Sequence, residues 1–360
     1  MTRAREIVEA VERIVPSSLT EEWDNSGFQV GDPDGEVDQV LVALTPLSEV
    51  FEEAEEIGAN FLLFHHPLIF KGLTRVDLGS YPGNLIARAV KRNLAIHAAH
   101  TNYDAAPGGV SVALAEALGL EGPLRVVVPK GETRKLVVFV PEEDVDAISD
   151  ALSEAGAGII GKYTRCTFRA PGTGTFFGGE GTNPYVGEKG RLEKVPEIRL
   201  ETVVPDYAAS RAAAAARAIH PYEEPELDIY PIDGHPEGCG YGRVGHMTKP
   251  LKPEELRDHV SESLGFPARL VADPRPERPV ERVAVLGGSG GSFIREAAAS
   301  GADAYVTGDL DYHDALLAES LGIVAMDAGH AATELPSLEP LARRLAELVG
   351  VPVSVSSVRR

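Results

Sequence analysis

Histidines and carboxylates occur at four separate places along the chain, each just after an apolar stretch that has the pattern of a buried strand. The residues are His65 and His66; Asp104, four positions after His100; Asp309 with His313; and Glu334, four positions after His330. Imidazole nitrogens and carboxylate oxygens are ligands that proteins use for zinc, manganese and iron. A histidine and a glutamate four residues apart lie on the same face of a helix. The residue types and their spacing therefore indicate a metal site.

The candidate ligands are numerous enough for two divalent ions, provided that the carboxylates bridge them. They are His65, His66, Asp104, His330 and Glu334. In hydrolytic enzymes such paired ions lie about 3.5–4 Å apart. Zinc, manganese and iron are all compatible with this set, because none of them needs a thiolate here. We interpret His100, Asp309 and His313 as candidates to orient the ligands or to transfer a proton.

The run Phe61–Phe64 is entirely apolar and leads directly into His65 and His66. It predicts a strand buried on both faces, as in a parallel sheet. Neighbouring side chains in a regular strand point to opposite faces. Pro67 cannot donate a ladder hydrogen bond, so the strand must end near it. We therefore expect the strand end to let both imidazoles turn to the same side.

The elements around these residues alternate between strands and helices. Apolar runs predict strands at 40–44, 94–100, 283–286, 304–306 and 322–326, and amphipathic patterns predict helices at 2–15, 48–57, 81–91, 107–118, 253–264, 293–299 and 338–348. This alternation indicates βαβ units and a parallel sheet. The carboxyl ends of parallel strands share one edge, where ligands bind. All four polar places should therefore meet there.

Between residues 126 and 240 the order becomes strand, helix, strands, helix, strand. The predicted strands are 136–140, two short ones at 166–169 and 174–177, 198–204 and 227–232, and the predicted helices are 144–155 and 207–219. This order is typical of a ferredoxin-like α+β unit. We therefore predict an α/β fold in which a parallel-sheet domain has helices on both faces. Residues 1–125 and 241–360 form that domain, and an inserted ferredoxin-like domain at 126–240 interrupts it.

Composition excludes several classes of protein. With 360 residues, 43% of them hydrophobic and 25% charged, the chain has the makeup of a globular protein of about two domains. It has no apolar run of transmembrane length and no signal-peptide pattern, and two cysteines cannot form a disulfide framework. We therefore expect a cytoplasmic protein. The formal net charge of −21 repels nucleic acid and anionic membranes, so neither is an expected partner.

Two other stretches admit a binding role or a purely structural one. Gly287–Gly291 lies between a predicted strand and a predicted helix, where exposed backbone amides favour anions. It matches neither a Walker loop nor GxGxxG, so a tight strand-to-helix turn explains it equally well. Asp24 and Asn25 lie in a loop beside Trp23 and could either bind a ligand or form a surface turn.

Several motifs together resemble one family, the Nif-three-like dinuclear metal-centre hexamer family, whose bacterial members are often named GTP cyclohydrolase 1 type 2 homologs. The matching stretches are 22–27 (EWDNSG), 64–70 (FHHPLIF), 100–104 (HTNYD), 307–309 (TGD) with 312–313 (YH), 329–330 (GH) with 333–334 (TE), and 220–225 (HPYEEP). The resemblance covers nearly the whole chain. It implies a two-metal site formed by the five candidate ligands. It also implies a toroidal homohexamer whose metal sites face an internal cavity, with the inserted domain covering the openings.

Three functions are compatible with these features. By resemblance, the first is a metal-dependent hydrolase of the GTP cyclohydrolase type, in which hydroxide attacks the C8 region of the purine and Gly287–Gly291 could hold the triphosphate. The second is phosphoester hydrolysis by the same ions, because two-metal sites favour in-line displacement. The third is a hexameric scaffold or regulatory ring in which the metals are structural. An assay of the metal-loaded protein against GTP and phosphodiesters separates the three.

Overall fold

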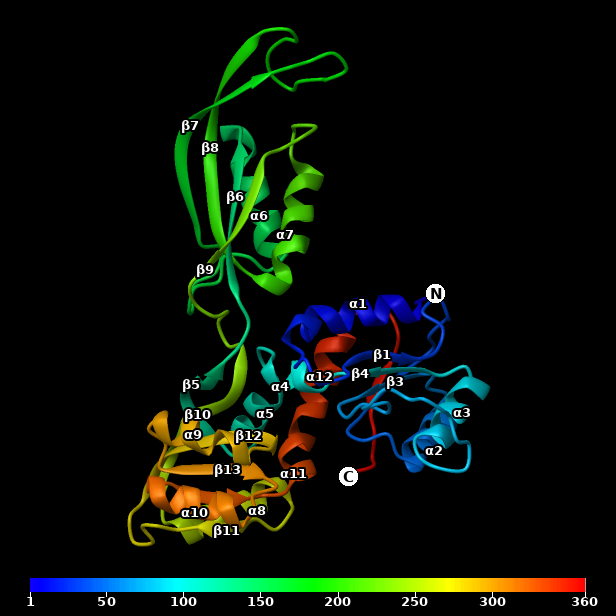
Figure 1. The fold of residues 1–360 in the computed structure, drawn as a ribbon, viewed down its shortest axis with the longest axis vertical. Helices are drawn as coiled ribbons and strands as arrows, with labels where there is room; N and C mark the ends of the chain where they lie inside the picture. Colours follow the sequence, from blue (N-terminus) through cyan, green and yellow to red (C-terminus); the bar gives the residue numbers. More distant parts are fainter. Residues whose placement is uncertain (360) are drawn as a thin grey trace. The chain divides into compact units, whose positions relative to one another are not determined.

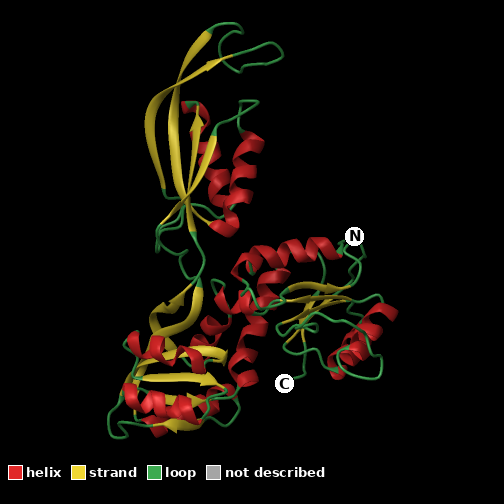
Figure 2. Cartoon of the chain, viewed as in Figure 1, coloured by secondary structure: helices red, strands yellow, loops and turns green. Residues whose placement is uncertain are grey.

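The computed structural model describes residues 1–359 and divides them into two compact units. Of these, residues 1–129 and 238–359 form the first unit, and residues 130–237 form the second. Figure 1 shows the course of the chain through each unit, and Figure 2 shows helices and strands in both. The fold is thus a mixed α/β fold with several sheets. None of the helices in residues 1–359 has both the length and the apolar character needed to cross a bilayer.

The first unit contains two mixed sheets rather than the single parallel sheet that the sequence predicts. One sheet has the strand order β1-β4-β3-β2-β15 and the other has the order β11-β14-β13-β12-β10-β5. The strands are β1 (Gly27–Val30), β2 (Val40–Ala43), β3 (Phe61–Phe64), β4 (Ala95–Ala98), β5 (Leu120–Pro129), β10 (Gly240–Leu251), β11 (Arg269–Ala272), β12 (Val280–Ser289), β13 (Ala304–Gly308), β14 (Val324–Asp327) and β15 (Val353–Val355). The predicted strands form the parallel centres of the two sheets, and antiparallel strands extend both.

Helices connect these strands and supply part of the core. They are α1 (Ala4–Ile14), α2 (Ser48–Ile57), α3 (Gly83–Lys91), α4 (Thr101–Ala105), α5 (Val110–Ala117), α8 (Pro253–Leu264), α9 (Ile294–Ala299), α10 (Tyr312–Leu321), α11 (His330–Glu334) and α12 (Leu338–Ala346). Phe51 of α2 stacks on Phe64 of β3 in the core of the first sheet. Leu256 and Val260 of α8 pack against the strands of the second sheet. Each sheet therefore has its own apolar core.

The second unit is a four-stranded antiparallel sheet with two helices. Its strand order is β7-β8-β6-β9, and the helices pack on one face of that sheet (Figure 2). The elements are β6 (Thr133–Val140), α6 (Val145–Glu154), β7 (Thr167–Phe177), β8 (Leu192–Pro205), α7 (Asp206–Ile219) and β9 (Leu227–Ile232). Where the sequence predicts two short strands, β7 is continuous through Pro171 and Gly172. As an edge strand it tolerates a proline, because one side of its backbone has no partner.

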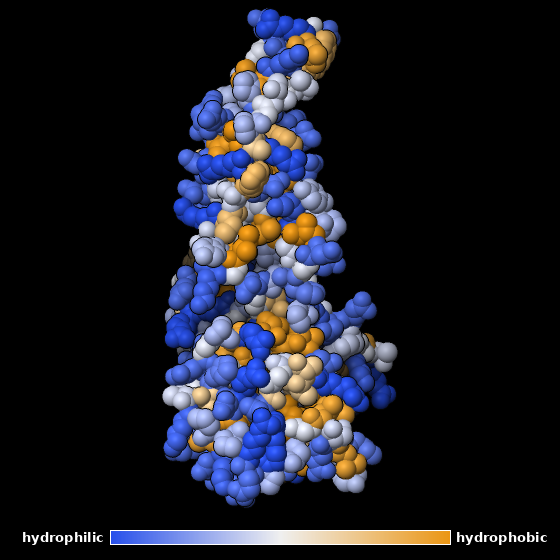
Figure 3. Space-filling view, turned by 90° about the vertical axis from the view of Figure 1, so that its left-hand side faces the viewer, coloured by the Kyte–Doolittle hydropathy of each residue, from blue (hydrophilic) through white to orange (hydrophobic). Residues whose placement is uncertain are grey.

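The surface agrees with the composition. The face shown in Figure 3 is mostly hydrophilic, with separate apolar patches between charged side chains. The 55 acidic residues outnumber the 34 basic ones. The residues of interest for chemistry lie instead inside the first unit.

Candidate metal centre

His65 and His66 follow the last residue of β3, at a bend between strand and loop. Their backbone N–H groups still donate to Ala43 and Leu44, at 3.0 and 2.9 Å, so the chain is held in place although the strand has ended. The two imidazole centroids lie 5.1 Å apart. Both imidazoles reach the same cluster of side chains, as expected from the strand end. His65 is completely buried.

Glu334 is the centre of the cluster. It is the last residue of α11, the short helix that begins at His330 after β14, and it is 2% exposed. Its Oε1 lies 3.3 Å from His65 Nε2 and 3.2 Å from His330 Nε2. Its Oε2 lies 3.1 Å from His66 Nε2. Asp104, from α4, lies with Oδ1 3.7 Å from His65 Nε2. The two sheets of the first unit therefore contribute to one site.

The imidazoles share one orientation: Nδ1 of each is occupied, and Nε2 is left to face the cluster. The pairs are His65 with the Ala99 carbonyl at 2.8 Å, His66 with Thr45 Oγ1 at 3.0 Å, His330 with Asp309 Oδ2 at 2.7 Å, and His100 with Asp24 Oδ1 at 2.8 Å. Histidines that bind metals are commonly held this way, because a partner on one nitrogen fixes the ring and raises the basicity of the other.

Several buried atoms of the cluster make no hydrogen bond in the described part of the chain. They are Nε2 of His65, Nε2 of His66, Oδ1 of Asp104 and Oε2 of Glu334. Such atoms are costly when buried without a partner. Ligand atoms converge within 4.8 Å in two overlapping groups, one of His65, His66 and His100 and one of His66, His330 and Glu334. The donor set and its convergence fit a metal ion.

The metal-free cluster also attracts positive charge. Burial opposes protonation of His65, but Glu334 and Asp104 outweigh it and raise its pKa to about 9. Hydrogen bonding to Glu334 raises the pKa of His330 to about 9. Burial would raise the pKa of Glu334, yet the surrounding imidazoles hold that pKa well below its usual range. Burial raises the pKa of Asp104 to about 6. The site therefore favours a cation between its carboxylates.

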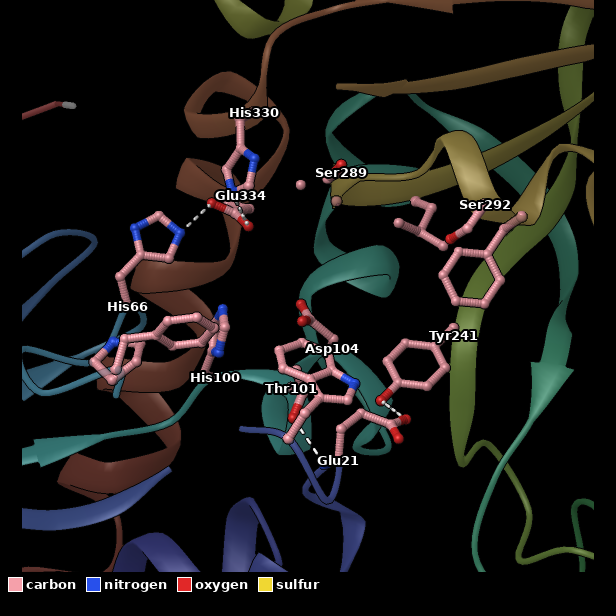
Figure 4. Close-up of a pocket in the computed structure, with 17 residues that line it drawn as sticks. Glu21, His66, His100, Thr101, Asp104, Tyr241, Ser289, Ser292, His330 and Glu334 are labelled. Carbon is pink, nitrogen blue, oxygen red and sulfur yellow. Dashed lines mark hydrogen bonds and ion pairs between the residues drawn. The ribbon is translucent and has the colours of Figure 1, made fainter. Parts of the chain in front are cut away.

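A cavity of about 720 Å³ opens onto the cluster. Figure 4 shows His66, His330 and Glu334 on one side of it and Glu21 and Tyr241 on the other, with Asp104 between them. Tyr241 Oη donates to Glu21 Oε1 at 2.6 Å. Burial and then the Glu21 carboxylate raise the pKa of Tyr241, so the phenol keeps its proton. A volume of this size suits a small organic ligand.

The other predicted site residues have different places. His100 lines the cavity, and Asp309 lies beside it, held to His330. His313 is exposed, packs against the ring of Tyr312 and does not line the cavity. Geometry therefore links His100 and Asp309 to the cluster but gives His313 no part in it.

The glycine stretch is only partly a loop. Gly287 and Gly288 belong to β12 and line the cavity. A Cβ on Gly288 would lie 2.6 Å from Glu334 Oε1, so glycine is required for close approach to that carboxylate. The following helix, α9, has six residues. Close approach to Glu334, rather than a tight turn, therefore explains Gly288, and the nearby carboxylate is unfavourable for an anion.

Glu21, Tyr241 and Thr45 were not among the predicted site residues. None of them lies beside a histidine or in one of the four polar places that the sequence singles out, and only the fold brings each to the site. For Asp24 the sequence allows either a binding role or a place in a surface turn. Its side chain is completely buried and accepts hydrogen bonds from Thr101 and Ser26 as well as pairing with His100. Asn25 instead donates to the Ile69 carbonyl, a structural contact.

Comparison with known proteins agrees with these features. The family model Duf34/NIF3 (NGG1p interacting factor 3) matches residues 2–360. A protein of Halalkalibacterium halodurans named "GTP cyclohydrolase 1 type 2 homolog" is 42% identical over 330 residues, which are 90% of this chain and 87% of that protein. One of the same name from Bacillus subtilis is 38% identical over 347 residues, 96% and 92% of the two chains.

A solved structure is also similar along nearly its whole length. It is described as a Bacillus cereus protein related to NIF3, and it matches with a TM-score of 0.87 and 39% identity over 99% of this chain and 97% of that one. The family match, the relatives and the fold agree over the same residues. This chain belongs to the Duf34/NIF3 family.

Proposed function

We propose that this protein binds two divalent metal ions through His65, His66, Asp104, His330 and Glu334 and hydrolyses a nucleotide at that site. The observation that carries the proposal is the convergence of buried ligand atoms, several of which make no hydrogen bond, in two overlapping groups that share His66. The names of the relatives support a reaction of the GTP cyclohydrolase type. Zinc, manganese and iron suit the nitrogen and oxygen donors equally.

Different residues of the site would hold the ions, orient the ligands and transfer protons. A bound divalent ion would lower the pKa of a water molecule and so supply a nucleophile near neutral pH. Glu334 and Asp104 would hold the ions between them, and Asp309 would fix the ring of His330. His100, held by Asp24 at Nδ1, presents Nε2 to the cavity and can accept or return a proton there.

Phosphoester hydrolysis at the same site is the second candidate, and one observation favours it. Of the 17 described residues that line the cavity, none is Lys or Arg. A triphosphate carries several negative charges, which nucleotide enzymes usually meet with cationic side chains as well as metal. A single phosphate has less charge to neutralise, and paired ions stabilise in-line displacement at phosphorus.

An assay of the metal-loaded protein tests both candidates. GTP and a panel of phosphomonoesters and phosphodiesters are incubated with wild type and with Glu334→Gln, and metal content is measured in parallel. Turnover of GTP by wild type alone supports the first candidate, and turnover of the esters alone supports the second. No turnover by fully metal-loaded protein contradicts both and favours a scaffold with structural metals.

We further propose the assembly and the domain roles that accompany this function. The chain would form a toroidal homohexamer in the cytoplasm, with residues 130–237 as an inserted domain of the ferredoxin-like type. The strand order of that unit supports the last point, because its first and third strands are the central ones. Light scattering coupled to size-exclusion chromatography tests the hexamer, and a mass of one or two chains would contradict it.

A further inference from the structure

The second unit contains a cavity of about 310 Å³ that lies within that unit alone. Val138 of β6 belongs to the core beneath the two helices, which cover one face of the sheet (Figure 2). Neighbouring side chains of a strand point to opposite faces, so Phe139, which lines the cavity, belongs to the face without helices. Residues 178–186, after β7, and residues 222–226, before β9, contribute further walls.

Aromatic rings form much of the lining. They belong to Phe139, Phe176, Phe177, Tyr185 and Tyr222. The ring centroids of Tyr185 and Tyr222 lie 6.1 Å apart, with the planes at 48°. One cation already lies beside this group, because the guanidinium of Arg199, which pairs with Glu201, is 5.9 Å from the ring centroid of Phe139. The faces of such rings attract cations electrostatically, by about 0.5–2 kcal/mol each.

The charged groups of the same cavity are all acidic. They are Glu197, Glu223, Glu224 and Glu226, and none of the 15 described lining residues is Lys, Arg or His. Glu197 is partly buried and lies against Gly174 of β7, where a Cβ would collide with its Oε2. Glycine at this position therefore makes room for the carboxylate. Carboxylates gathered around one cavity repel one another, and a cation between them removes that repulsion.

Two aspects of the stretch 220–225 (HPYEEP), a motif that the metal centre does not use, fit this cavity. His220 holds the stretch against β6: its Nε2 pairs with the Phe139 carbonyl at 3.0 Å, and its Nδ1 accepts from the Tyr222 N–H at 3.1 Å. Tyr222 Oη is buried near Glu197 without a hydrogen bond of good geometry. Burial and the Glu197 carboxylate raise the pKa of Tyr222, so the phenol keeps its proton. The motif thus places a ring and two carboxylates at the cavity.

The carboxylates of this cavity are not arranged as ligands of a metal ion. Among the described residues, sets of three ligand atoms within 4.8 Å of one another form at the metal centre, and no carboxylate of this cavity belongs to one. A calcium ion needs several oxygens about 2.3–2.6 Å from one point. An organic cation spreads its charge over a larger volume and offers carbon atoms to aromatic rings, so it matches separated carboxylates between rings. The volume is near the lower end for small-molecule sites, so the ligand must be small.

We propose that this cavity of the second unit binds a small organic cation, an amine or a quaternary ammonium ion that carries an apolar group. Glu197 and the neighbouring glutamates meet the positive charge, and the aromatic rings contact the rest of the ligand. The inference goes beyond the proposed function, because this cavity shares no lining residue with the cavity at the metal cluster. Its failure would leave the metal centre untouched.

Isothermal titration calorimetry of the full-length chain, in the presence of zinc, measures the binding. The probes are benzyltrimethylammonium and, as a neutral aromatic molecule, benzyl alcohol; calcium chloride and a tetralysine peptide represent a metal ion and a basic protein segment. Glu197→Gln removes the charge nearest to Tyr222, and Glu154→Gln, at the exposed end of α6, is its matched control. Tyr185→Leu removes an exposed ring of the cavity, and Tyr163→Leu, an exposed tyrosine that does not line it, is the control. Circular dichroism verifies that each variant is folded.

Wild type and both controls are expected to bind the ammonium ion at least about tenfold more tightly than the alcohol. Glu197→Gln should weaken binding of the ion at least about threefold, and Tyr185→Leu about two- to fivefold. Equal affinity for the two aromatic probes overturns the inference, as does no binding of the ion by wild type. Either variant with the affinity of its control also overturns it. Binding of calcium or of the peptide in place of the ammonium ion overturns it in favour of a metal site or a protein partner.

Discussion

Removing the charge of Glu334 should abolish most of the metal affinity while leaving the shape of the cluster nearly unchanged. Glu334→Gln keeps the volume of the side chain but replaces one carboxylate oxygen with an amide nitrogen. In the structure the two oxygens lie 3.1–3.3 Å from three imidazoles, so any ion bound there is close to this charge. Two unit charges about 4 Å apart interact by about 4 kcal/mol at an effective dielectric constant of about 20. Since the ion is divalent, the loss in affinity should be at least about 10³-fold, the factor that this energy represents.

Competition with a chromophoric chelator measures this affinity for zinc, manganese and iron(II) in turn. Glu339→Gln is the matched control, because Glu339 is an exposed glutamate on the next helix, α12. Breaking a buried ion pair can itself cost about 3–5 kcal/mol, so circular dichroism must show that each variant is folded. Folded Glu334→Gln with wild-type affinity, or an equal loss in Glu339→Gln, would refute the reasoning.

Three other changes test the supports of the site and of the core. Gly288→Ala should lower metal affinity at least about tenfold, because the new Cβ would collide with Glu334. Gly58→Ala, at a similar positive φ but in open space, should leave metal affinity unchanged. Equal metal affinity of the two variants in chelator competition would contradict this prediction. Asp309→Asn should weaken metal affinity about 10–100-fold, because it releases the His330 imidazole that Asp309 orients, and thermal stability should not change. Wild-type metal affinity in this variant would contradict the orienting role of Asp309. Burial lowers the pKa of His97 from 6.5 to about 4. Between these pH values the folded protein keeps His97 neutral, whereas the unfolded chain takes up a proton. The contribution of His97 to the free energy of unfolding is therefore complete above about pH 6.5 and falls by up to about 3 kcal/mol towards pH 4. In urea titrations at pH 7.5, 5.5 and 4.5, His97→Phe should lose less unfolding free energy with falling pH than wild type does. An equal loss in the two proteins would contradict this role of His97.

The parallel centres of both sheets could be predicted because their strands are buried on both faces. Phe61–Phe64 and the strand at 304–306 read as continuous apolar runs, which only such burial explains. The helix at 253–264 and the strand at 227–232 have the predicted bounds. In the first case Pro253 and Gly265 mark the two ends, as a proline in the first turn and a left-handed glycine should.

The division into two sheets could not be predicted, because the antiparallel strands carry little pattern. β10 contains three glycines, so its sequence resembles a glycine-rich loop, and β5 is largely exposed. β15 is only three residues long. Strands of this kind are fixed by their partners across the sheet rather than by their own residues. The same limit applies to Glu21 and Tyr241, which meet only because the loop before β1 lies against β10.

The convergence of the histidines could be predicted, because the sequence marks the point where strand β3 ends. Two adjacent histidines can reach one site only where the strand ends, and Pro67 marks that end. The imidazole centroids of His66 and His330 lie 5.3 Å apart, although 264 positions separate the two residues. No pattern revealed two of the residues that orient the imidazoles: Thr45 was not singled out at all, and the sequence did not indicate that Asp24 holds His100.

The metal centre itself is tested most directly by anomalous diffraction from crystals of protein purified without chelators, with data collected across the zinc, manganese and iron absorption edges. The account predicts two anomalous peaks, each about 2.0–2.3 Å from ligand atoms drawn from His65, His66, Asp104, His330 and Glu334. Well-ordered side chains at these five residues with no peak among them, in protein grown with all three metals, would contradict it.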